Sequence, residues 1–87
     1  MSATITTVEI SADQQRRIDQ ARARLQAASL RVVACSQDQL AAGYMRQAGN
    51  PIYAGQSEHC AGMAVQAESY AARTRAEADL VEAEAGL

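Results

Sequence analysis

The sequence has no tryptophan, no phenylalanine and no lysine, and its only aromatic residues are three tyrosines among 87 residues. It also has a single proline, a single asparagine and a single histidine. The apolar fraction of 48% is largely alanine, of which there are 20. Burial of an alanine removes only about one methyl group from water, roughly 0.8 kcal/mol per carbon. One small domain of this composition is therefore expected to have a thin hydrophobic core.

Targeting and membrane segments are also missing from the pattern. The N-terminus lacks a basic region followed by an apolar run, and no apolar run approaches the length of a membrane span. A net charge of -2 gives no overall attraction to nucleic acid or to anionic lipid. Eight arginines without lysine, beside so much alanine, are typical of GC-rich coding and indicate a bacterial or phage genome. We expect a cytoplasmic protein with no membrane partner, and the charge argues against direct nucleic-acid binding.

No arrangement typical of an enzyme or a metal site is present. The sequence has no paired-histidine helix motif, no glycine-rich phosphate loop and no nucleophile elbow. His59 and Cys60 are adjacent, and neighbouring residues of a helix point about 100° apart, so the two do not meet. A zinc site that also used Cys35 would still lack a convincing fourth ligand. We expect no catalytic activity, no cofactor and no bound metal.

The first ten residues and the rest of the chain have different patterns. Residues 4–10, TITTVEI, are rich in β-branched residues and predict an extended arm over residues 1–10, either a tail or a strand that pairs with another chain. Ser11 followed by Gln14 is a capping box, which predicts the start of a helix. Residues 11–87 are expected to form a single helical domain.

Two apolar stripes at helical spacing follow the capping box. The first contains Ile18, Ala21, Leu25, Ala28, Val32, Cys35, Leu40 and Ala42. The second contains Ile52, Cys60, Met63, Ala67, Tyr70, Thr74, Ala78, Val81 and Ala85, and Gly86 would close its helix. Between them, Gly49 suits a left-handed helix end, Asn50 an N-cap and Pro51 a first helical position. The pattern predicts an all-α fold, an antiparallel helical hairpin whose two stripes face each other. Gly43 offers an alternative end for the first helix, with a longer loop.

A tight turn at Gly49 and Asn50 places residue i of the first helix beside residue 99 − i of the second. Four arginines would then lie beside four acidic residues, a match that favours this turn over the longer loop. The arginines are Arg16, Arg17, Arg22 and Arg24, and their expected partners are Glu82, Glu84, Glu77 and Asp79. A dimeric bundle that binds RNA is the alternative if these arginines are free of acidic partners.

The same register bears on Cys35 and Cys60. It offsets them by four residues, about 6 Å along the axis, in addition to a helix separation of about 8 to 10 Å. This exceeds the roughly 7 Å Cα separation that a disulfide tolerates. The interpretation that we favour is two small reduced thiols in the seam, whereas the longer loop would make a bridge feasible.

Two sets of residues are candidates for contact with a protein partner. The first lies around the turn and combines residue types enriched at interfaces: Tyr44, Met45, Arg46, Ile52, Tyr53 and His59. A purely structural role for the tyrosines at the end of the core is the alternative. The second is an acidic stripe that could occupy a basic groove: Glu68, Glu77, Asp79, Glu82 and Glu84. Alanine faces outside the hairpin seam would also allow a second copy to complete a four-helix bundle; these are Ala27, Ala34, Ala41, Ala61, Ala64 and Ala71.

These observations predict a small non-enzymatic protein-binding module that docks onto or blocks a larger assembly. In size, acidity and helical character the chain is similar in kind to phage-encoded inhibitors of host defence, such as anti-CRISPR proteins, which implies steric or charge blocking of a nucleic-acid-handling assembly. The alternative is a secreted helical hairpin. The turn of the present sequence reads GNPIY, and a later segment that begins with Tyr70 reads YAART. In length and layout the chain resembles the WXG100 family, whose turn is Trp-x-Gly and whose tyrosine is followed by an acidic residue.

Overall fold

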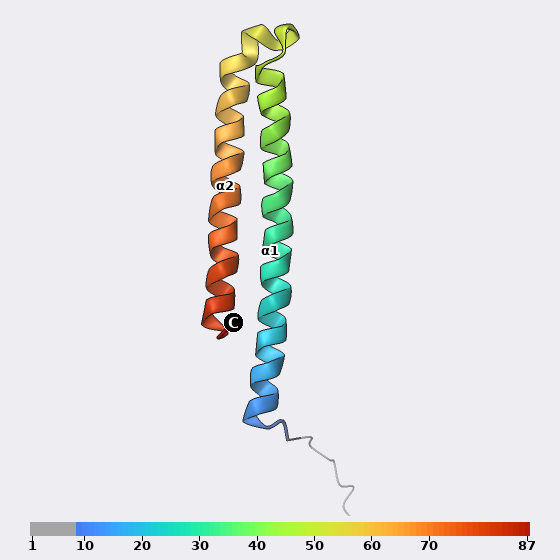
Figure 1. The fold of residues 1–87 in the computed structure, drawn as a ribbon, viewed down its shortest axis with the longest axis vertical. Helices are drawn as coiled ribbons and strands as arrows, with labels where there is room; N and C mark the ends of the chain where they lie inside the picture. The colour runs from blue at the N-terminus through green and yellow to red at the C-terminus, as the bar shows by residue number, and fades with distance from the viewer. Residues whose placement is uncertain (1–8) are drawn as a thin grey trace, which may run out of the picture.

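The computed structural model describes residues 9–87, so the predicted arm over residues 1–10 falls almost wholly outside the described residues. Within this range the chain folds into one hairpin of two long antiparallel helices without a strand (Figure 1). Helix α1 spans Ala12–Ala48, a 3-10 helix η1 spans Pro51–Gln56 and helix α2 spans Ser57–Glu84. The predicted all-α antiparallel hairpin is confirmed.

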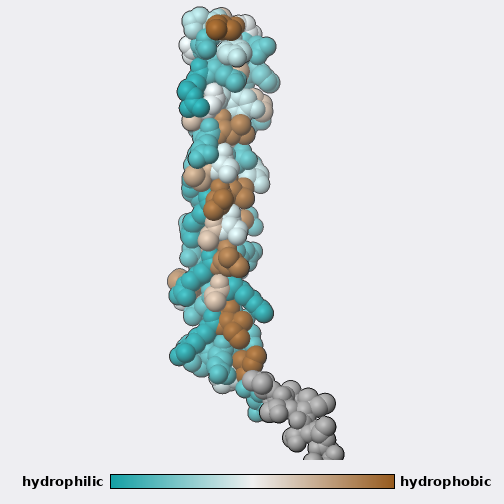
Figure 2. All heavy atoms as spheres, turned by 90° about the vertical axis from the view of Figure 1, so that its right-hand side faces the viewer, coloured by the Kyte–Doolittle hydropathy of each residue, from teal (hydrophilic) through white to brown (hydrophobic). Residues whose placement is uncertain are grey.

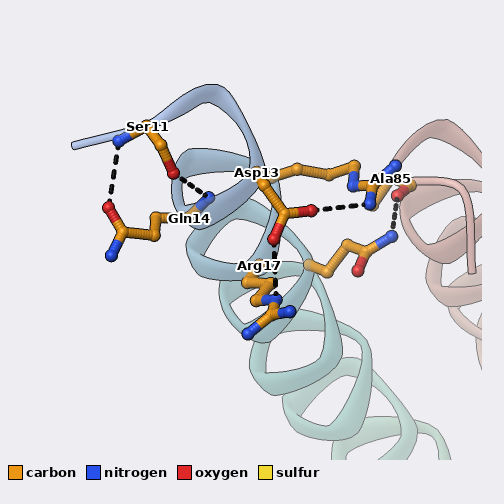
Figure 3. Close-up of polar contacts among 7 residues, drawn as sticks. Ser11, Asp13, Gln14, Arg17 and Ala85 are labelled. Atoms are coloured by element: carbon orange, nitrogen blue, oxygen red, sulfur yellow. Dashed lines mark hydrogen bonds and ion pairs between the residues drawn. The ribbon is translucent and has the colours of Figure 1, made fainter.

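Helix α1 begins where the capping box predicts. The Ser11 hydroxyl accepts a hydrogen bond from the Gln14 amide at 3.1 Å, and the Gln14 side chain accepts one from the Ser11 amide at 3.0 Å (Figure 3). Asp13 lies in the first turn, where a negative charge is favourable, and forms ion pairs with Arg16 and Arg17. Side chains in this first turn thus provide acceptors for two backbone amides, and the charge of Asp13 interacts favourably with the helix dipole.

The connector differs from the predicted tight turn. Helix α1 continues through Gly43 to Ala48, which excludes the predicted alternative end at Gly43. Gly49 has φ of -89°, a right-handed conformation, so the predicted left-handed helix end at this residue is wrong. Asn50 and Pro51 occupy the predicted N-cap and first helical positions, but they open the 3-10 helix η1 before α2 begins. The connector between α1 and α2 is therefore longer than the predicted tight turn by the six residues of η1.

Helix α2 ends at the predicted glycine. Gly86 has φ of +77°, which an L side chain rarely adopts. Its amide donates to the Ala83 carbonyl at 3.1 Å, and the Leu87 amide donates to the Glu82 carbonyl at 2.9 Å. This pair of bonds is a Schellman motif, and it satisfies carbonyls that the end of a helix leaves open.

Alanines spaced by seven residues form the seam between the helices. Ala27, Ala34 and Ala41 of α1 are buried, and so are the alanines at 64, 71 and 78 of α2. The register is fixed at both ends: the Gln20 amide group donates to the Ala85 carbonyl at 3.2 Å, and the Ser57 hydroxyl to the Ala48 carbonyl at 2.6 Å. Residue i of α1 therefore lies beside residue 105 − i of α2. The three alanine pairs form three level layers, in the heptad arrangement of a coiled coil.

This register corrects two predictions. The expected register of 99 − i is wrong, because the six residues of η1 displace α2 along α1 by that amount. The expected inward stripe of α1 is wrong too. Leu25 and Val32 are 70% and 66% exposed, and Leu40 and Cys35 are exposed as well. The predicted stripe of α2 holds better, since Cys60, Ala67, Thr74 and Ala78 are buried, although Ile52 and Tyr70 are exposed.

The alanine seam has consequences for packing and for dimerisation. Five of the six alanines assigned to exposed outer faces are buried inside the hairpin itself, at positions 27, 34, 41, 64 and 71, and Ala61 is partly buried. They are therefore unavailable to a second copy in the intact hairpin, and dimerisation into a four-helix bundle stays a prediction. Among residues 9–87 no large side chain is completely buried. The seam lets the helices approach closely but buries little apolar area per residue.

Candidate functional site

The six candidate residues at the turn end divide into two groups. Tyr44 is partly buried and packs against the cluster of Ala41, Ala64 and Ala67, so it belongs to the end of the seam. The other five are exposed: Met45, Arg46, Ile52, Tyr53 and His59. Ile52 is the most exposed large apolar residue of the described chain, at 84%. Tyr44 thus packs as the structural alternative expects, whereas Ile52 and Tyr53 are exposed to solvent on η1.

Hydrogen bonds hold this exposed turn in one shape. The Asn50 side chain accepts from the Ile52 amide at 3.0 Å, and the Asn50 carbonyl accepts from the Tyr53 amide at 2.9 Å. The Ser57 bond to the Ala48 carbonyl ties the start of α2 to the end of α1 across the connector. A contact made through Ile52 would therefore involve a pre-formed turn rather than a loose loop.

The five acidic candidates do not form one continuous stripe. The inward heptads of α2 place Glu68, Asp79 and Glu82 on one flank of the hairpin, and Glu77 and Glu84 on the opposite flank. Asp79 and Glu82 both form ion pairs with Arg31 of α1. Arg31 thus partly neutralises their charge within the hairpin. Because the five acidic residues lie on two flanks, they cannot all face a single basic groove.

The predicted ion pairs between the N-terminal arginines and the C-terminal acids are absent from residues 9–87. Arg16 and Arg17 pair with Asp13 instead, and no ion pair includes Arg22 or Arg24. Arg31, which the sequence reasoning left out, takes the interhelical role. Hydrogen bonds to Glu82 and then Asp79 raise the pKa of Arg31, and a hydrogen bond to Asp38 raises the pKa of Arg75. Both guanidinium groups remain charged, and both join α1 to α2 on the same flank.

The two thiols are free and occupy different environments. Cys60 is buried in the seam with its Sγ 3.7 Å from the Gln47 side-chain oxygen, whereas Cys35 is exposed on α1. The observed register separates them along the axis by ten residues, about 15 Å. A disulfide between them is excluded in this fold. The prediction of a buried seam thiol is right for Cys60 and wrong for Cys35.

We expect a thiol reagent such as Ellman's reagent to modify Cys35 rapidly in the native chain and Cys60 only on unfolding, because the thiolate must be accessible to react. The reaction of wild type should show a fast and a slow phase of similar amplitude. In the matched variants, Cys35→Ser should lose the fast phase and Cys60→Ala the slow one. Equal rates for both thiols in the native protein would contradict the placement of Cys60 in the seam.

The outward side of α1 carries a row of apolar residues, which we name the outer stripe: Ile18, Ala21, Leu25, Ala28, Val32 and Cys35. Leu25 and Val32 are exposed and Ile18 is partly buried. Figure 2 shows this side of the molecule, where apolar side chains form a column along α1 between hydrophilic ones. At its lower end lies an open hollow of about 340 Å³, lined by Ile10, Gln14, Arg17 and Ile18. Helix α1 here extends beyond the end of α2 (Figure 1).

A second apolar area lies on one flank between the helices. Leu40 and Tyr44 of α1 and Met63 and Tyr70 of α2 line a shallow depression of about 190 Å³. Leu40 and Tyr70 are each 47% exposed. The opposite flank carries the ion pairs of Arg31 and Arg75. The hairpin is thus apolar on its outer stripe and, towards the turn, on one flank, whereas Glu77 and Glu84 occupy the other end of that same flank.

Within residues 9–87, His, Cys, Asp and Glu nowhere gather in threes. Neither α1 nor α2 combines the length and the apolar character that crossing a lipid bilayer requires. Comparison of the chain with protein-family models, curated proteins and solved structures gives no match. Its function must therefore be argued from the surfaces described above.

The sequence reasoning missed the outer stripe as a surface because it assigned those residues to the core. One pattern could have revealed the true seam: alanines recur every seven residues at 27, 34 and 41 and again at 64, 71 and 78. A hydrophobicity scale ranks alanine below leucine and valine, and it therefore favours the wrong face of α1.

Proposed function

We propose that the chain is a non-enzymatic protein-binding module that docks along its length onto a larger assembly and so blocks part of that assembly's surface. One observation carries the proposal: Ala27, Ala34 and Ala41 of α1 are buried in the seam, whereas Leu25 and Val32 face solvent. Exposed apolar rows between polar side chains mark sites of interaction with other proteins. A slim hairpin offers a long surface but little enclosed volume, which suits docking better than catalysis.

The proposal is tested by capture of partners on the immobilised full chain. We expect Leu25→Gln with Val32→Gln to reduce retention of a specific partner by about tenfold or more, because each buried aliphatic side chain contributes about 1.5–3 kcal/mol. The matched control is Val65→Gln with Leu80→Gln, which removes one exposed valine and one exposed leucine from α2 instead. The readout is quantitative mass spectrometry of the retained proteins.

The same assay tests the turn end. Tyr53→Ala with Arg46→Ala should weaken capture only if the turn is part of the contact. Equal retention by wild type and by all three double variants would contradict docking through any of these surfaces. Failure of wild type to retain any protein above a blank matrix would contradict the proposed function itself.

A secreted hairpin of the WXG100 kind is the second candidate, and the two long antiparallel helices joined by a short connector favour it. It differs from the first candidate in where the chain is found. Accumulation of the chain in the culture medium without cell lysis would support secretion, whereas retention in the cell would favour the docking module.

A further inference from the structure

We infer that the outer stripe of α1 is the seam for a partner α-helix whose own apolar seam is flanked by acidic residues. This inference rests on the proposed function and adds the chemistry of the partner. It starts from the spacing: Ile18, Leu25 and Val32 recur every seven residues, and the small residues at 21, 28 and 35 recur between them. Such alternating steps of three and four are the pattern of a coiled-coil seam, which another helix fills.

Helix α1 therefore has two seams of the same period on different sides. The inner seam is occupied by α2, whereas Leu25 and Val32 of the outer stripe are not covered by any other part of residues 9–87. A β-strand or an irregular loop would match the sevenfold spacing poorly, because its side chains alternate every two residues or follow no period. A helix laid along α1 meets all six stripe residues in succession, and the small residues at 21, 28 and 35 let its backbone approach closely.

The charges beside the stripe select the kind of helix. The positions that border the outer stripe hold four arginines, Arg17, Arg22, Arg24 and Arg31. Arg17 and Arg31 already pair with acidic residues of the chain. Arg22 and Arg24 lie on opposite borders of Leu25, and neither has an ion pair within residues 9–87. Acidic residues on the borders of the partner helix would complement both edges. The hollow beside Ile18 likewise combines apolar side chains, Ile10 and Ile18, with an arginine, Arg17.

The same charges argue against a second copy of this chain on the stripe. Two outer stripes packed together would bring Arg22 and Arg24 of one chain close to arginines of the other, and like charges at these borders disfavour association. They also argue against nucleic acid as the occupant. Leu25 and Val32 occupy the centre of the surface, and no aromatic residue lies among them to stack on bases.

The test uses two synthetic helical peptides of about four heptads with identical apolar seams, one with glutamate and one with lysine at the border positions. Like-charged borders keep each peptide from pairing with itself. Fluorescence anisotropy with the full chain is expected to show about tenfold tighter binding of the glutamate peptide. Leu25→Gln with Val32→Gln should abolish binding of this peptide, whereas Val65→Gln with Leu80→Gln should leave it unchanged. Arg22→Gln with Arg24→Gln should remove most of the preference for glutamate.

Several outcomes would overturn the inference. Equal affinity for the two peptides would contradict the preference for acidic borders, although docking by apolar contact would still stand. Binding of neither peptide, or binding that survives the change at Leu25 and Val32, would remove the outer stripe as a helix seam. Sedimentation that shows a dimer abolished by the same change would assign the stripe to a second copy. Tighter, salt-sensitive binding of a single-stranded RNA of about 20 nucleotides would assign the arginines to phosphate contacts. The capture assay above reports separately on the proposed function.

Discussion

Replacing Ala34 and Ala71 together by leucine is expected to lower the free energy of unfolding by about 2–6 kcal/mol, because overpacking a close seam costs about 1–3 kcal/mol per site. Both alanines are completely buried and occupy one level of the seam. The neighbouring layers, Ala27 with Ala78 and Ala41 with Ala64, hold the helices close on both sides. Two leucines between them act as a wedge. Urea denaturation followed by circular dichroism measures the change.

The matched control is Ala28→Leu with Ala72→Leu, which makes the same two changes on the exposed sides of the same helices. Alanine and leucine have similar helix propensities, so this variant should stay within about 0.5 kcal/mol of wild type. A seam variant more stable than wild type would mean that the seam has room for leucine, and the close approach of the helices would be wrong.

The local features of this fold could be read from the sequence because each depends on a few neighbouring residues. The capping box of Ser11 and Gln14, the N-cap at Asn50 and the left-handed Gly86 are all decided within one helical turn. The inward face of α2 was also largely recognisable, since Cys60, Ala67, Thr74 and Ala78 of the predicted stripe are buried. These parts required no knowledge of what the helices pack against.

The inward face of α1 could not be chosen in this way because α1 has two regular stripes. One consists of alanines at 27, 34 and 41, and the other includes Leu25 and Val32. Hydrophobicity favours the second, whereas close packing against the alanines of α2 favours the first. The choice depends on the partner helix and on the register, and the register in turn depends on η1, whose six residues resemble an ordinary start of a helix with Pro51 at its first position.

The candidate site shows the same limit. Ile52 and Tyr53 were recognised because they flank an evident turn, and both are displayed there. Arg31 was overlooked because its acidic partners, Asp79 and Glu82, are decided by the register. The outer stripe was identified as apolar but placed on the wrong side. Its exposure follows only after the alanines are known to fill the seam.

The thin seam and the exposed stripe have a common consequence for stability. Alanine layers contribute little burial, and much of the apolar area of α1 stays exposed to solvent. A ligand that binds only the folded hairpin stabilises it by about 2.7 kcal/mol when present at a hundred times its dissociation constant. Such a gain is comparable to the loss expected from the seam variant. Partner binding and folding of this chain are therefore expected to be strongly linked.

Joining the seam covalently should reveal its register most directly. In a background of Cys35→Ser and Cys60→Ala, we expect Ala27→Cys with Ala78→Cys to form a disulfide and to raise the free energy of unfolding by about 4 kcal/mol, the value for closing a loop of about 50 residues. The two positions form one level layer of the observed seam. Urea denaturation of the oxidised and reduced forms measures the difference.

The control joins Ala27→Cys to Ala72→Cys, the partner that a tight turn at Asn50 would have given. Ala72 is exposed and lies six residues, about 9 Å along the axis, from the level of Ala27, which exceeds the reach of a disulfide. This pair should remain reduced or form bridges only between molecules. Efficient closure of the control pair, with no closure of the first, would mean that η1 does not displace α2. The alanines of α1 and α2 would then no longer lie at the same levels in the seam. The assignment of the outer stripe to the solvent-facing side of α1 would fail with them.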